Sequence, residues 1–263
     1  MHVLVTNDDG IDSPGLWALA QAMRACGAEV SVVAPAEEQS AMSMALPPQR
    51  DRELRAIIPP VELDGVRAFA HNGSPVACVT IAMLSGVLPR IDAVVSGINR
   101  GINSGTNVLL SGTVGAAMIG ALWGLPAMAV SLKFHGPGPL PWGTAAYAAQ
   151  RLFPLLEQIR PYVPLVINVN VPHVTDPSEL RGFRQTRLSE FFFGHYLDLE
   201  LNPHGPAERQ QVNFRFARER VPTFAPDTDD GAVAAGYVSV TLLRPLIDHA
   251  PLEVPLPDVG CQE

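Results

Sequence analysis

The sequence predicts an α/β fold with a doubly wound, mostly parallel sheet. Three observations lead to this prediction. Short, nearly all-apolar runs recur up to about residue 175, helical patterns separate them, and polar clusters directly follow several of the runs. Strands that are apolar on both faces belong to a parallel sheet covered by helices on both sides. In such folds ligands bind beyond the carboxyl ends of the strands.

The expected elements alternate along the chain. Ser13-Pro14 and Ser74-Pro75 each place a capping residue before a first-turn proline, so each starts a helix. The apolar runs place strands at residues 2–6, 29–34, 91–96, 127–132 and 163–171. Helices are expected over residues 13–26, 74–87, 111–122 and 144–159, with a linker rich in Pro and Gly at residues 136–143.

The chain changes character after about residue 175. Charged residues, aromatic residues such as Phe191-Phe192-Phe193, and irregular pieces become more frequent, and residues 237–243 form a clear strand pattern. We therefore expect a metal- and phosphate-binding α/β core over residues 1–175. A β-rich or irregular extension over residues 176–263 would make oligomer contacts and return the strand at about 237–243 to the fold.

Composition narrows the possible partners. The chain has 263 residues, 47% of them hydrophobic, and a formal net charge of −8. Such a chain buries a sizeable core, and its acidity argues against binding a nucleic acid polymer, which depends on Lys and Arg. A small phosphorylated ligand needs only a local site, where a metal ion can supply positive charge.

We expect a cytoplasmic protein that does not enter a membrane. The uncharged stretch from residue 101 to 132 contains Asn103, Asn107 and Pro126, so it is read as a loop, a buried helix and a strand. The amino terminus lacks a signal-peptide pattern. Three widely spaced cysteines fit reduced thiols rather than a disulfide framework.

Polar clusters follow three of the predicted strands. Asp8-Asp9 follows the first strand, Ser40 lies beyond the second and Asn99 follows the third. Adjacent carboxylates repel each other unless a cation lies beside them, and oxygen ligands without nearby His or Cys favour a hard ion such as Mg²⁺, Mn²⁺ or Ca²⁺. The alternative is an Asp-Asp-Gly turn with solvated carboxylates.

A possible phosphate site follows the third strand. It comprises the segment from Asn103 to Thr106 and then Ser111-Gly112-Thr113, which begins a helix rich in Gly and Ala. Free backbone N–H groups and the positive end of the helix dipole favour anions there. The alternative is an ordinary serine N-cap.

Other motifs are absent or weak. The sequence has no dinucleotide-binding glycine motif, no P-loop lysine and no Gly-x-Ser-x-Gly turn. His71 lies near the turn at Gly73, where a structural or surface role is the favoured interpretation. Trp17 and Trp123, at helical positions, are expected in the core.

Ordered motifs nevertheless span almost the whole chain. They are Val5-Thr6-Asn7-Asp8-Asp9-Gly10-Ile11 with Pro14-Gly15, Val33-Ala34-Pro35 with Ser40-Ala41, Gly73-Ser74-Pro75 with Cys78, Ser96-Gly97-Ile98-Asn99-Arg100-Gly101 with Asn103, Ser111-Gly112-Thr113, Ile167-Asn168-Val169-Asn170-Val171-Pro172, and Thr228-Asp229 with Gly236-Tyr237-Val238-Ser239. In these blocks the chain resembles the SurE family of survival-protein 5'-nucleotidases. The resemblance implies a Rossmann-like fold and homodimers or homotetramers that exchange C-terminal segments.

The resemblance also implies the reaction and its residues. Substrates would be nucleoside 5'-monophosphates, sometimes 3'-monophosphates, with short polyphosphate as a side activity. One divalent ion per subunit, Mg²⁺ or Mn²⁺, would be held by Asp8, Asp9, Ser40 and Asn99. The phosphate would be held by Asn103, Ser111, Gly112 and Thr113.

Three positions depart from the family pattern. Ala36 and Gln39 replace an acid and an arginine around the second strand end, and Ala77 replaces an acid before Cys78. These changes bear on loop order around Ser40, local charge and nucleotide preference.

Asp8 and Asp9 are the expected catalytic residues, with Asp8 binding metal and orienting or deprotonating a water. Two rivals stay open. One is a hydrolase that forms an aspartyl-phosphate, which needs a lysine, and Lys133 is the sole candidate. The other is a non-catalytic nucleotide or metal sensor with the same site.

Overall fold

The computed structural model describes residues 1–48, 52–134, 136, 138–203 and 210–246. A nine-stranded sheet forms its centre, in the order β3-β4-β2-β1-β5-β6-β7-β11-β8. The strands of this sheet are β1 (His2–Thr6), β2 (Glu29–Pro35), β3 (Leu54–Ile57), β4 (Arg67–His71), β5 (Ala93–Arg100), β6 (Ala127–Leu132), β7 (Val166–Val171), β8 (Phe183–Gln185) and β11 (Val238–Leu243).

Parallel pairing dominates the sheet. β1 pairs in parallel with β2 and β5, and the β2–β4, β5–β6 and β6–β7 pairs are also parallel. β3 and β11 run antiparallel to their neighbours β4 and β7. The predicted doubly wound, mostly parallel sheet is therefore confirmed.

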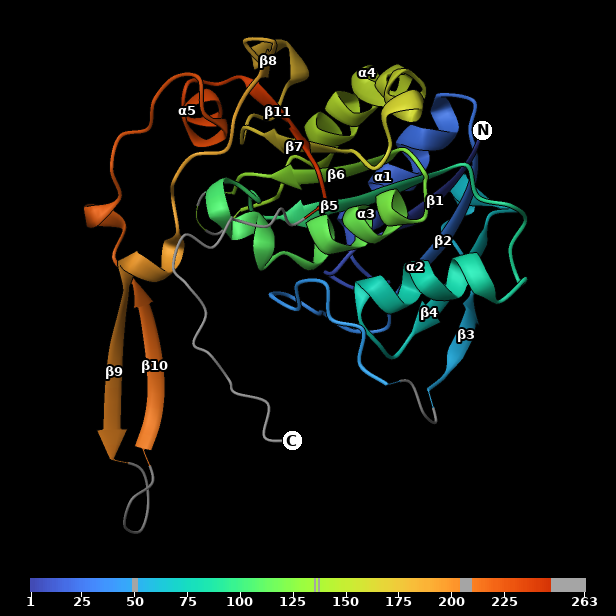
Figure 1. Cartoon of the computed structure of the whole chain (residues 1–263), viewed down its shortest axis with the longest axis horizontal. Helices are drawn as coiled ribbons and strands as arrows, with labels where there is room; N and C mark the ends of the chain where they lie inside the picture. Colours follow the sequence, from blue (N-terminus) through green and yellow to red (C-terminus); the bar gives the residue numbers. More distant parts are fainter. Residues whose placement is uncertain (49–51, 135, 137, 204–209, 247–263) are drawn as a thin grey trace, which may run out of the picture.

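Helices cover both faces of the sheet. Figure 1 shows α1 and α4 on one side and α2 and α3 on the other, and a separate hydrophobic core lies under each pair. The helices are α1 (Pro14–Ala25), α2 (Pro75–Leu84), α3 (Gly112–Leu122), α4 (Trp142–Ile159) and α5 (Asp229–Ala234). Short 3-10 helices lie at Val61–Leu63, Gly105–Leu109, Arg160–Tyr162, Pro177–Glu179, Phe193–Tyr196 and Arg218–Arg220.

Local chemistry explains where the site-forming helices begin. Ser74 accepts a hydrogen bond from Ala77 N at the start of α2, and Ser111 accepts one from Val114 N at the start of α3. Small residues let α3 lie close to the sheet, because a Cβ on Gly120 would come within 2.6 Å of Val94. This close packing holds α3 against β5.

The structure corrects several expected boundaries. The sequence prediction missed β3 and β4, and β7 begins at Val166 rather than at residue 163, after a proline that lacks an N–H donor. Trp17 is partly buried against the core, but Trp123 ends α3 with 43% of its surface exposed. The core prediction for Trp123 was therefore wrong, since a helix-ending residue points away from the packed stripe.

The C-terminal part contributes to two sheets. β11 and β8 extend the main sheet beyond β7, whereas β9 (Leu197–Pro203) and β10 (Gln210–Phe216) form a separate antiparallel hairpin that projects away from it (Figure 1). Residues 204–209 and 247–263 of the predicted extension lie outside the described residues, as does residue 137 of the predicted linker. In the described part of the chain, no helix is both long enough and apolar enough to cross a membrane.

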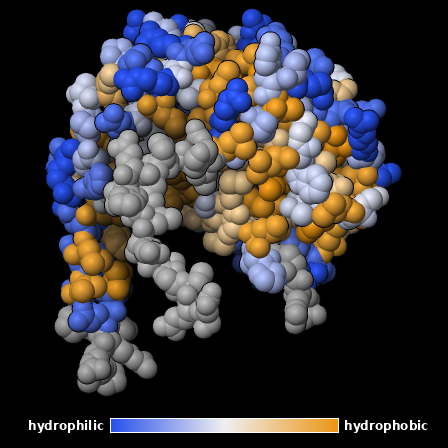
Figure 2. Space-filling model, viewed as in Figure 1, coloured by the Kyte–Doolittle hydropathy of each residue, from blue (hydrophilic) through white to orange (hydrophobic). Residues whose placement is uncertain are grey.

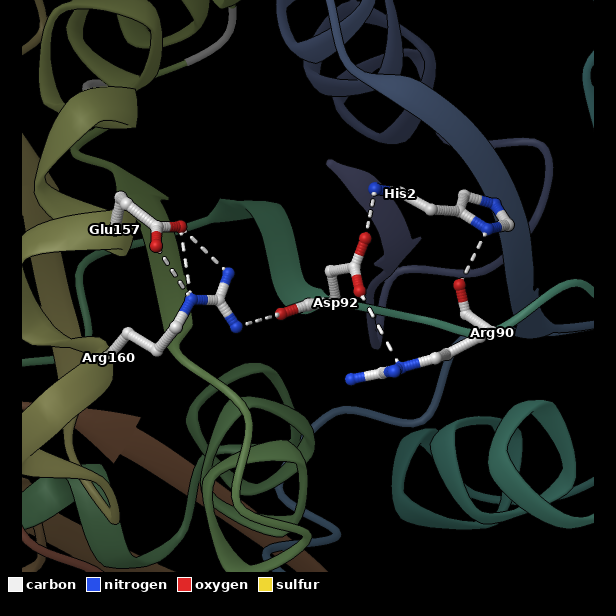
Figure 3. Close-up of polar contacts among 5 residues, drawn as sticks. All are labelled: His2, Arg90, Asp92, Glu157 and Arg160. Atoms are coloured by element: carbon white, nitrogen blue, oxygen red, sulfur yellow. Dashed lines mark hydrogen bonds and ion pairs between the residues drawn. The ribbon is translucent and has the colours of Figure 1, made fainter.

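Polar contacts tie β1, β5 and α4 together at the amino ends of the strands. His2 N donates to the Asp92 carboxylate at 2.9 Å, and Arg160 Nη1 donates to the Asp92 backbone oxygen at 3.3 Å (Figure 3). Arg160 also forms an ion pair with Glu157 at 2.9 Å. These contacts stabilise the edge of the sheet where the strands begin. The carboxyl ends of the strands lie at the opposite edge, where ligands bind in folds of this kind.

Candidate active site

The polar residues predicted from the sequence converge at the carboxyl ends of β1 and β5. A hollow of about 330 Å³ is lined by Asp8, Ser40, Asn99, Asn103 and Ser111, among others. A second hollow, of about 440 Å³, contains Asp9 and shares Ser40 with the first. The two hollows are therefore neighbours, and between them they are lined by all four predicted metal ligands.

A larger hollow, of about 460 Å³, lies at the other end of the sheet. It is lined by His2, Glu29 and Arg67, which are the first residues of β1, β2 and β4. Ligands of doubly wound folds bind at the carboxyl ends of strands, and the adjacent acidic residues Asp8 and Asp9 lie at that end of the sheet. We therefore place the candidate site at the smaller hollows.

Asp8 is held by the amino end of α3. Its side chain is buried, and its Oδ2 accepts a hydrogen bond from Thr113 N at 3.0 Å while its Oδ1 accepts one from the Thr113 hydroxyl. A Cβ on Gly112 would lie 2.9 Å from both Cβ and Oδ2 of Asp8. Glycine at this position therefore lets the helix end approach the carboxylate closely.

Asp9 lies beside Asp8 in an acidic environment. Asp9 Oδ2 accepts a hydrogen bond from Arg100 N at 3.1 Å, but burial and the Asp8 charge together raise the pKa of Asp9 to about 6. Burial also raises the pKa of Asp8, against the opposing effect of its bonds to Thr113. Glu38 adds another negative charge nearby. A cation bound here would favour both ionised carboxylates.

Ser40 and Asn99 complete the predicted ligand set. The backbone N–H of Gln39 donates to the Asp8 backbone oxygen at 2.7 Å, which holds the Ser40 loop against the end of β1, and Ser40 Oγ donates to Glu38 at 2.6 Å. Asn99 donates through Nδ2 to Gly101 O at 2.7 Å. Within the described residues no donor reaches the Asn99 side-chain oxygen, which can therefore serve a metal.

This donor set fits a hard divalent ion. It combines two carboxylates with a hydroxyl and an amide oxygen, the ligand types that Mg²⁺ and Mn²⁺ take. Among the residues that the structure describes, no three His, Cys, Asp or Glu side chains gather as a metal cluster. The candidate centre therefore depends on Ser40 and Asn99 as well as on the acidic pair.

The predicted phosphate residues surround the amino end of α3. Ser111 lines the hollow, and its oxygen caps the helix at Val114 N with a distance of 3.1 Å. Both donors of Thr113 are directed at Asp8, so in this structure Thr113 holds the carboxylate. Asn103 lines the hollow too, and its Nδ2 donates to Ser131 at 2.9 Å.

Two asparagines of β7 fix the loop that carries Asn103. Asn170 accepts from Asn103 N at 2.8 Å, and both Asn168 and Asn170 donate to Asn103 O, at 2.9 and 3.0 Å. The sequence analysis gave these residues no role. Two asparagines in the otherwise apolar strand VINVNV were the available signal, because buried amides need partners.

A buried acidic pair on α5 holds two further loops beside the hollow that contains Asp8. Asp229 accepts hydrogen bonds from Gly105 N at 2.8 Å and Ser189 N at 2.9 Å. Asp230, which lines the hollow, accepts from the hydroxyls of Ser104 at 2.8 Å and Ser189 at 2.6 Å. Asp229 belongs to one of the blocks that resemble the SurE family, but no role for the pair was predicted, since only the fold brings it to the Ser104 loop.

Two aromatic rings form the apolar part of the wall. Phe191 and Phe193 line the hollow, and their backbone is held by Asn107, which accepts from Phe193 N at 3.0 Å and donates to Phe191 O at 3.2 Å. The Phe191 ring also stacks on Tyr196, with 5.2 Å between centroids. The hollow thus has a polar end at Asp8 and an apolar wall formed by the Phe191 and Phe193 rings.

Sequence comparison identifies the family. The profile described as survival protein SurE matches residues 3–194. The chain belongs to the SurE family. A protein of Ectopseudomonas mendocina named 5'-nucleotidase SurE is 41% identical over 246 residues, covering 93% of this chain and 92% of that one. A Geobacter sulfurreducens protein of the same name is 37% identical over 260 residues, covering 97% and 92%.

A solved SurE structure has the same fold. The crystal structure of the SurE protein from Aquifex aeolicus superposes with a TM-score of 0.73 and 26% sequence identity, covering 94% of this chain and 95% of that chain. This similarity extends over the α/β core and the C-terminal part alike. It agrees with the fold class expected for a SurE protein.

The departures from the family pattern lie outside the candidate hollows. Ala36 and Gln39 line a separate cavity of about 200 Å³ beside His71, and Ala77 is buried in α2. His71 is buried as well, and its Nδ1 lies 2.8 Å from Glu53 O. The structural role expected for His71 fits this position.

Proposed function

We propose that this chain is a 5'-nucleotidase that uses a divalent metal ion, Mg²⁺ or Mn²⁺, to remove phosphate from nucleoside 5'-monophosphates. The observation that carries the proposal is the placement of Asp8, which lies at the amino end of α3 with Asp9 beside it. Ser40 and Asn99 line the same hollow. The relatives named 5'-nucleotidase SurE support the reaction type.

The four oxygen-bearing residues Asp8, Asp9, Ser40 and Asn99 would hold the ion. When bound, such an ion acts as a Lewis acid toward a phosphate oxygen and lowers the pKa of a coordinated water. The buried acidic pair needs this positive charge, since burial raises the pKa of both carboxyl groups. Metal and carboxylates would therefore stabilise each other.

Asp8 would handle the proton of the attacking water. Its carboxylate is oriented by both donors of Thr113, and burial raises its pKa. As the water oxygen bonds to phosphorus, Asp8 takes the water proton, and the bond from phosphorus to the 5' oxygen breaks. The nucleoside leaves as an alcohol once its oxygen is protonated from solvent.

The amino end of α3 would bind the phosphate group. The hydroxyl of Ser111 and the N–H of Gly112 lie where the helix dipole is positive, and negative charge grows on the phosphate oxygens during transfer. Asn103 would complete this group, whereas Thr113 would act through Asp8, to which both of its donors are directed. The same group of residues would also bind the phosphate of a 3'-monophosphate or the end of a short polyphosphate, because its contacts are to phosphate oxygens.

The nucleoside would lie against Phe191 and Phe193. These rings line the hollow that contains Asp8, and aromatic rings stack favourably on nucleobases at about 1–3 kcal/mol per base. An apolar wall beside a phosphate cradle suits a nucleotide better than inorganic phosphate. The wall is held by backbone contacts to Asn107, so it is formed before substrate binds.

The aspartyl-phosphate rival gains little from the structure. Lys133 directly follows β6, where its backbone bonds to Val171 O at 2.9 Å, and its side chain is not among the groups that line the two described hollows. Its charge acts on Asp230 rather than on Asp8. A non-catalytic nucleotide sensor remains the second candidate, and turnover separates it from the enzyme.

The test is phosphate release from a panel of nucleoside monophosphates with Mg²⁺, Mn²⁺ or EDTA. The wild type should release phosphate only with metal, and Asp8→Ala should abolish release. Asp12→Ala is the matched control, because Asp12 is an exposed acid of the same loop. Absence of release with every metal and nucleotide would instead favour the sensor.

Asp8→Asn tests the proton-handling role separately. The amide keeps the size of the side chain but cannot take a proton at neutral pH. We expect metal binding to persist more than turnover does. An Asp8→Asn protein that binds metal and keeps near-normal turnover would remove this role from Asp8.

The β9–β10 hairpin supports a homodimer or homotetramer. Strand alternation and cross-strand pairing put six apolar side chains on one face of this ribbon, and Figure 2 shows hydrophobic surface along it. Phe214 is 67% exposed and its cross-strand partner Leu199 is 56% exposed. An isolated two-stranded ribbon is marginally stable in water, so a second copy of the chain would cover this face.

Light scattering coupled to size-exclusion chromatography tests this assembly. Phe214→Ser should shift the protein toward monomer, whereas Asn213→Ser on the opposite face should not. An unchanged mass for Phe214→Ser would show that the hairpin face does not hold the oligomer together.

A further inference from the structure

The candidate site carries much more negative than positive charge. Asp8 and Asp230 line one hollow, and Asp9 and Glu38 line the other. A nucleoside monophosphate brings further negative charge, and a single divalent ion offsets only part of the total. The site therefore needs a cationic side chain from the protein.

Arg100 is the cation in the right place. It lines both hollows, and it is the only Lys, Arg or His among the described residues that line either one. As the last residue of β5, it is fixed by its backbone N–H, which donates to Asp9 Oδ2 at 3.1 Å. The strand end and the acidic pair thus present this side chain at the site.

The guanidinium of Arg100 is supported yet still available. Its central carbon lies 5.2 Å from the centroid of the Phe134 ring, and it makes no hydrogen bond or ion pair with any residue that the structure describes. Arg160 and Arg187, in contrast, are paired with the carboxylates of Glu157 and Asp227. A ring orients an arginine without using its N–H donors, which remain free for a ligand.

We propose that Arg100 contacts the substrate, with its guanidinium donating hydrogen bonds to the non-bridging phosphate oxygens while Phe134 holds it at the mouth of the site. The proposal rests on the proposed nucleotidase function. A planar guanidinium binds two phosphate oxygens at once, which an ammonium group does not. The contact strengthens as negative charge builds on the phosphate during transfer.

Loss of the guanidinium should weaken both binding and turnover. For Arg100→Met we expect kcat/KM to fall by about ten- to a few hundredfold, the effect of one charge-assisted hydrogen-bonding group. Inorganic phosphate should inhibit this variant less strongly than it inhibits the wild type. Arg100→Lys should recover only part of the loss, and added guanidinium ion should partly rescue Arg100→Met, which a purely structural role does not predict.

Two further variants sharpen the test. Arg90→Met removes the same charge just before the other end of β5, where Arg90 is highly exposed and 3.8 Å from Asp92 (Figure 3), so it should keep wild-type activity. Phe134→Leu removes the ring while leaving Arg100, and should lower kcat/KM by about two- to fivefold, the worth of an exposed cation–π contact. Thermal unfolding of each variant confirms that it is folded.

The outcomes separate this proposal from the proposed function. If the wild type releases phosphate and Arg100→Met matches Arg90→Met in kcat/KM and in phosphate inhibition, the Arg100 proposal is wrong and the nucleotidase stands. If the wild type releases no phosphate, the nucleotidase fails. Calorimetric binding of inorganic phosphate with Mg²⁺ then decides the Arg100 contact, which requires weaker binding by Arg100→Met than by Arg90→Met.

Discussion

Substitution of Gly112 by alanine perturbs the contact on which the site depends. The new Cβ would lie 2.9 Å from both Cβ and Oδ2 of Asp8 and 3.2 Å from Pro75 Cγ. Ordinary carbon contacts begin near 3.4 Å, so Asp8 or the end of α3 must move by about half an ångström. The Asp8 carboxylate would then lose its alignment with Thr113.

The expected loss is larger for activity than for stability. Overpacking a tight site costs about 1–3 kcal/mol, and the better helix propensity of alanine offsets about 1 kcal/mol of this. A misplacement of about 1 Å can cost about a hundredfold in rate. For Gly112→Ala we therefore expect kcat to fall by about ten- to a hundredfold while the protein stays folded.

The assay compares two glycine-to-alanine variants. Gly143 lies in the first turn of α4, where an added Cβ has no neighbour within 4 Å. Gly143→Ala should raise the free energy of unfolding by about 0.4–1 kcal/mol and leave kcat unchanged. Phosphate release and urea unfolding are measured on both variants and on the wild type.

A Gly112→Ala protein with wild-type kcat would refute this reasoning. It would mean either that the Asp8 carboxylate tolerates the shift or that it has no part in the reaction. A loss of activity in Gly143→Ala of similar size would also count against the argument, because that site offers no steric conflict.

Three other perturbations have defined outcomes. Asp229→Ala removes the acceptor of three buried N–H groups, so urea unfolding should show a loss of at least about 3 kcal/mol, whereas the exposed Asp227→Ala should have little effect. The pKa of Asp9 is raised to about 6, so its contribution to stability is present at low pH and lost as the pH rises through 6. Between pH 4 and 7 the thermal midpoint of the metal-free wild type should therefore fall more than that of Asp9→Asn. Lys133→Arg should keep phosphate release within about threefold of wild type, because the proposed reaction forms no phospho-enzyme that needs the lysine.

Each of these expectations can fail in a specific way. Equal unfolding energies for the Asp229 and Asp227 variants would mean that the buried acid does not hold the Ser104 and Ser189 loops. Identical pH profiles for wild type and Asp9→Asn would contradict the raised pKa. Loss of activity in the Lys133 variant would revive the aspartyl-phosphate mechanism.

The sequence was enough to group the candidate site residues because strand ends are easily recognised. Asp8 and Ser40 lie beyond β1 and β2, Asn99 lies near the carboxyl end of β5, and parallel topology brings such strand ends to one edge. Ser111 was recognisable as a cap, and its helix indeed begins at the next residue. Local patterns of this kind need no knowledge of distant contacts.

Long-range contacts account for what the sequence did not predict. Asp229 reaches Gly105 across 124 positions of the chain, and Asn170 reaches Asn103 across 67, so no local pattern relates them. β3 and β4 were missed because β3 is short and β4 alternates Ala with larger residues in the pattern RAFAH. Tertiary pairing, rather than strand propensity, stabilises such segments.

The most direct test of the account is to titrate Mn²⁺ into EDTA-treated protein while measuring ion binding and phosphate release together. We expect one ion per chain, with phosphate release from a nucleoside 5'-monophosphate rising in step with occupancy, and loss of both in Asp8→Ala. Full phosphate release in the presence of EDTA, or tight Mn²⁺ binding with unchanged release by Asp8→Ala, would contradict it.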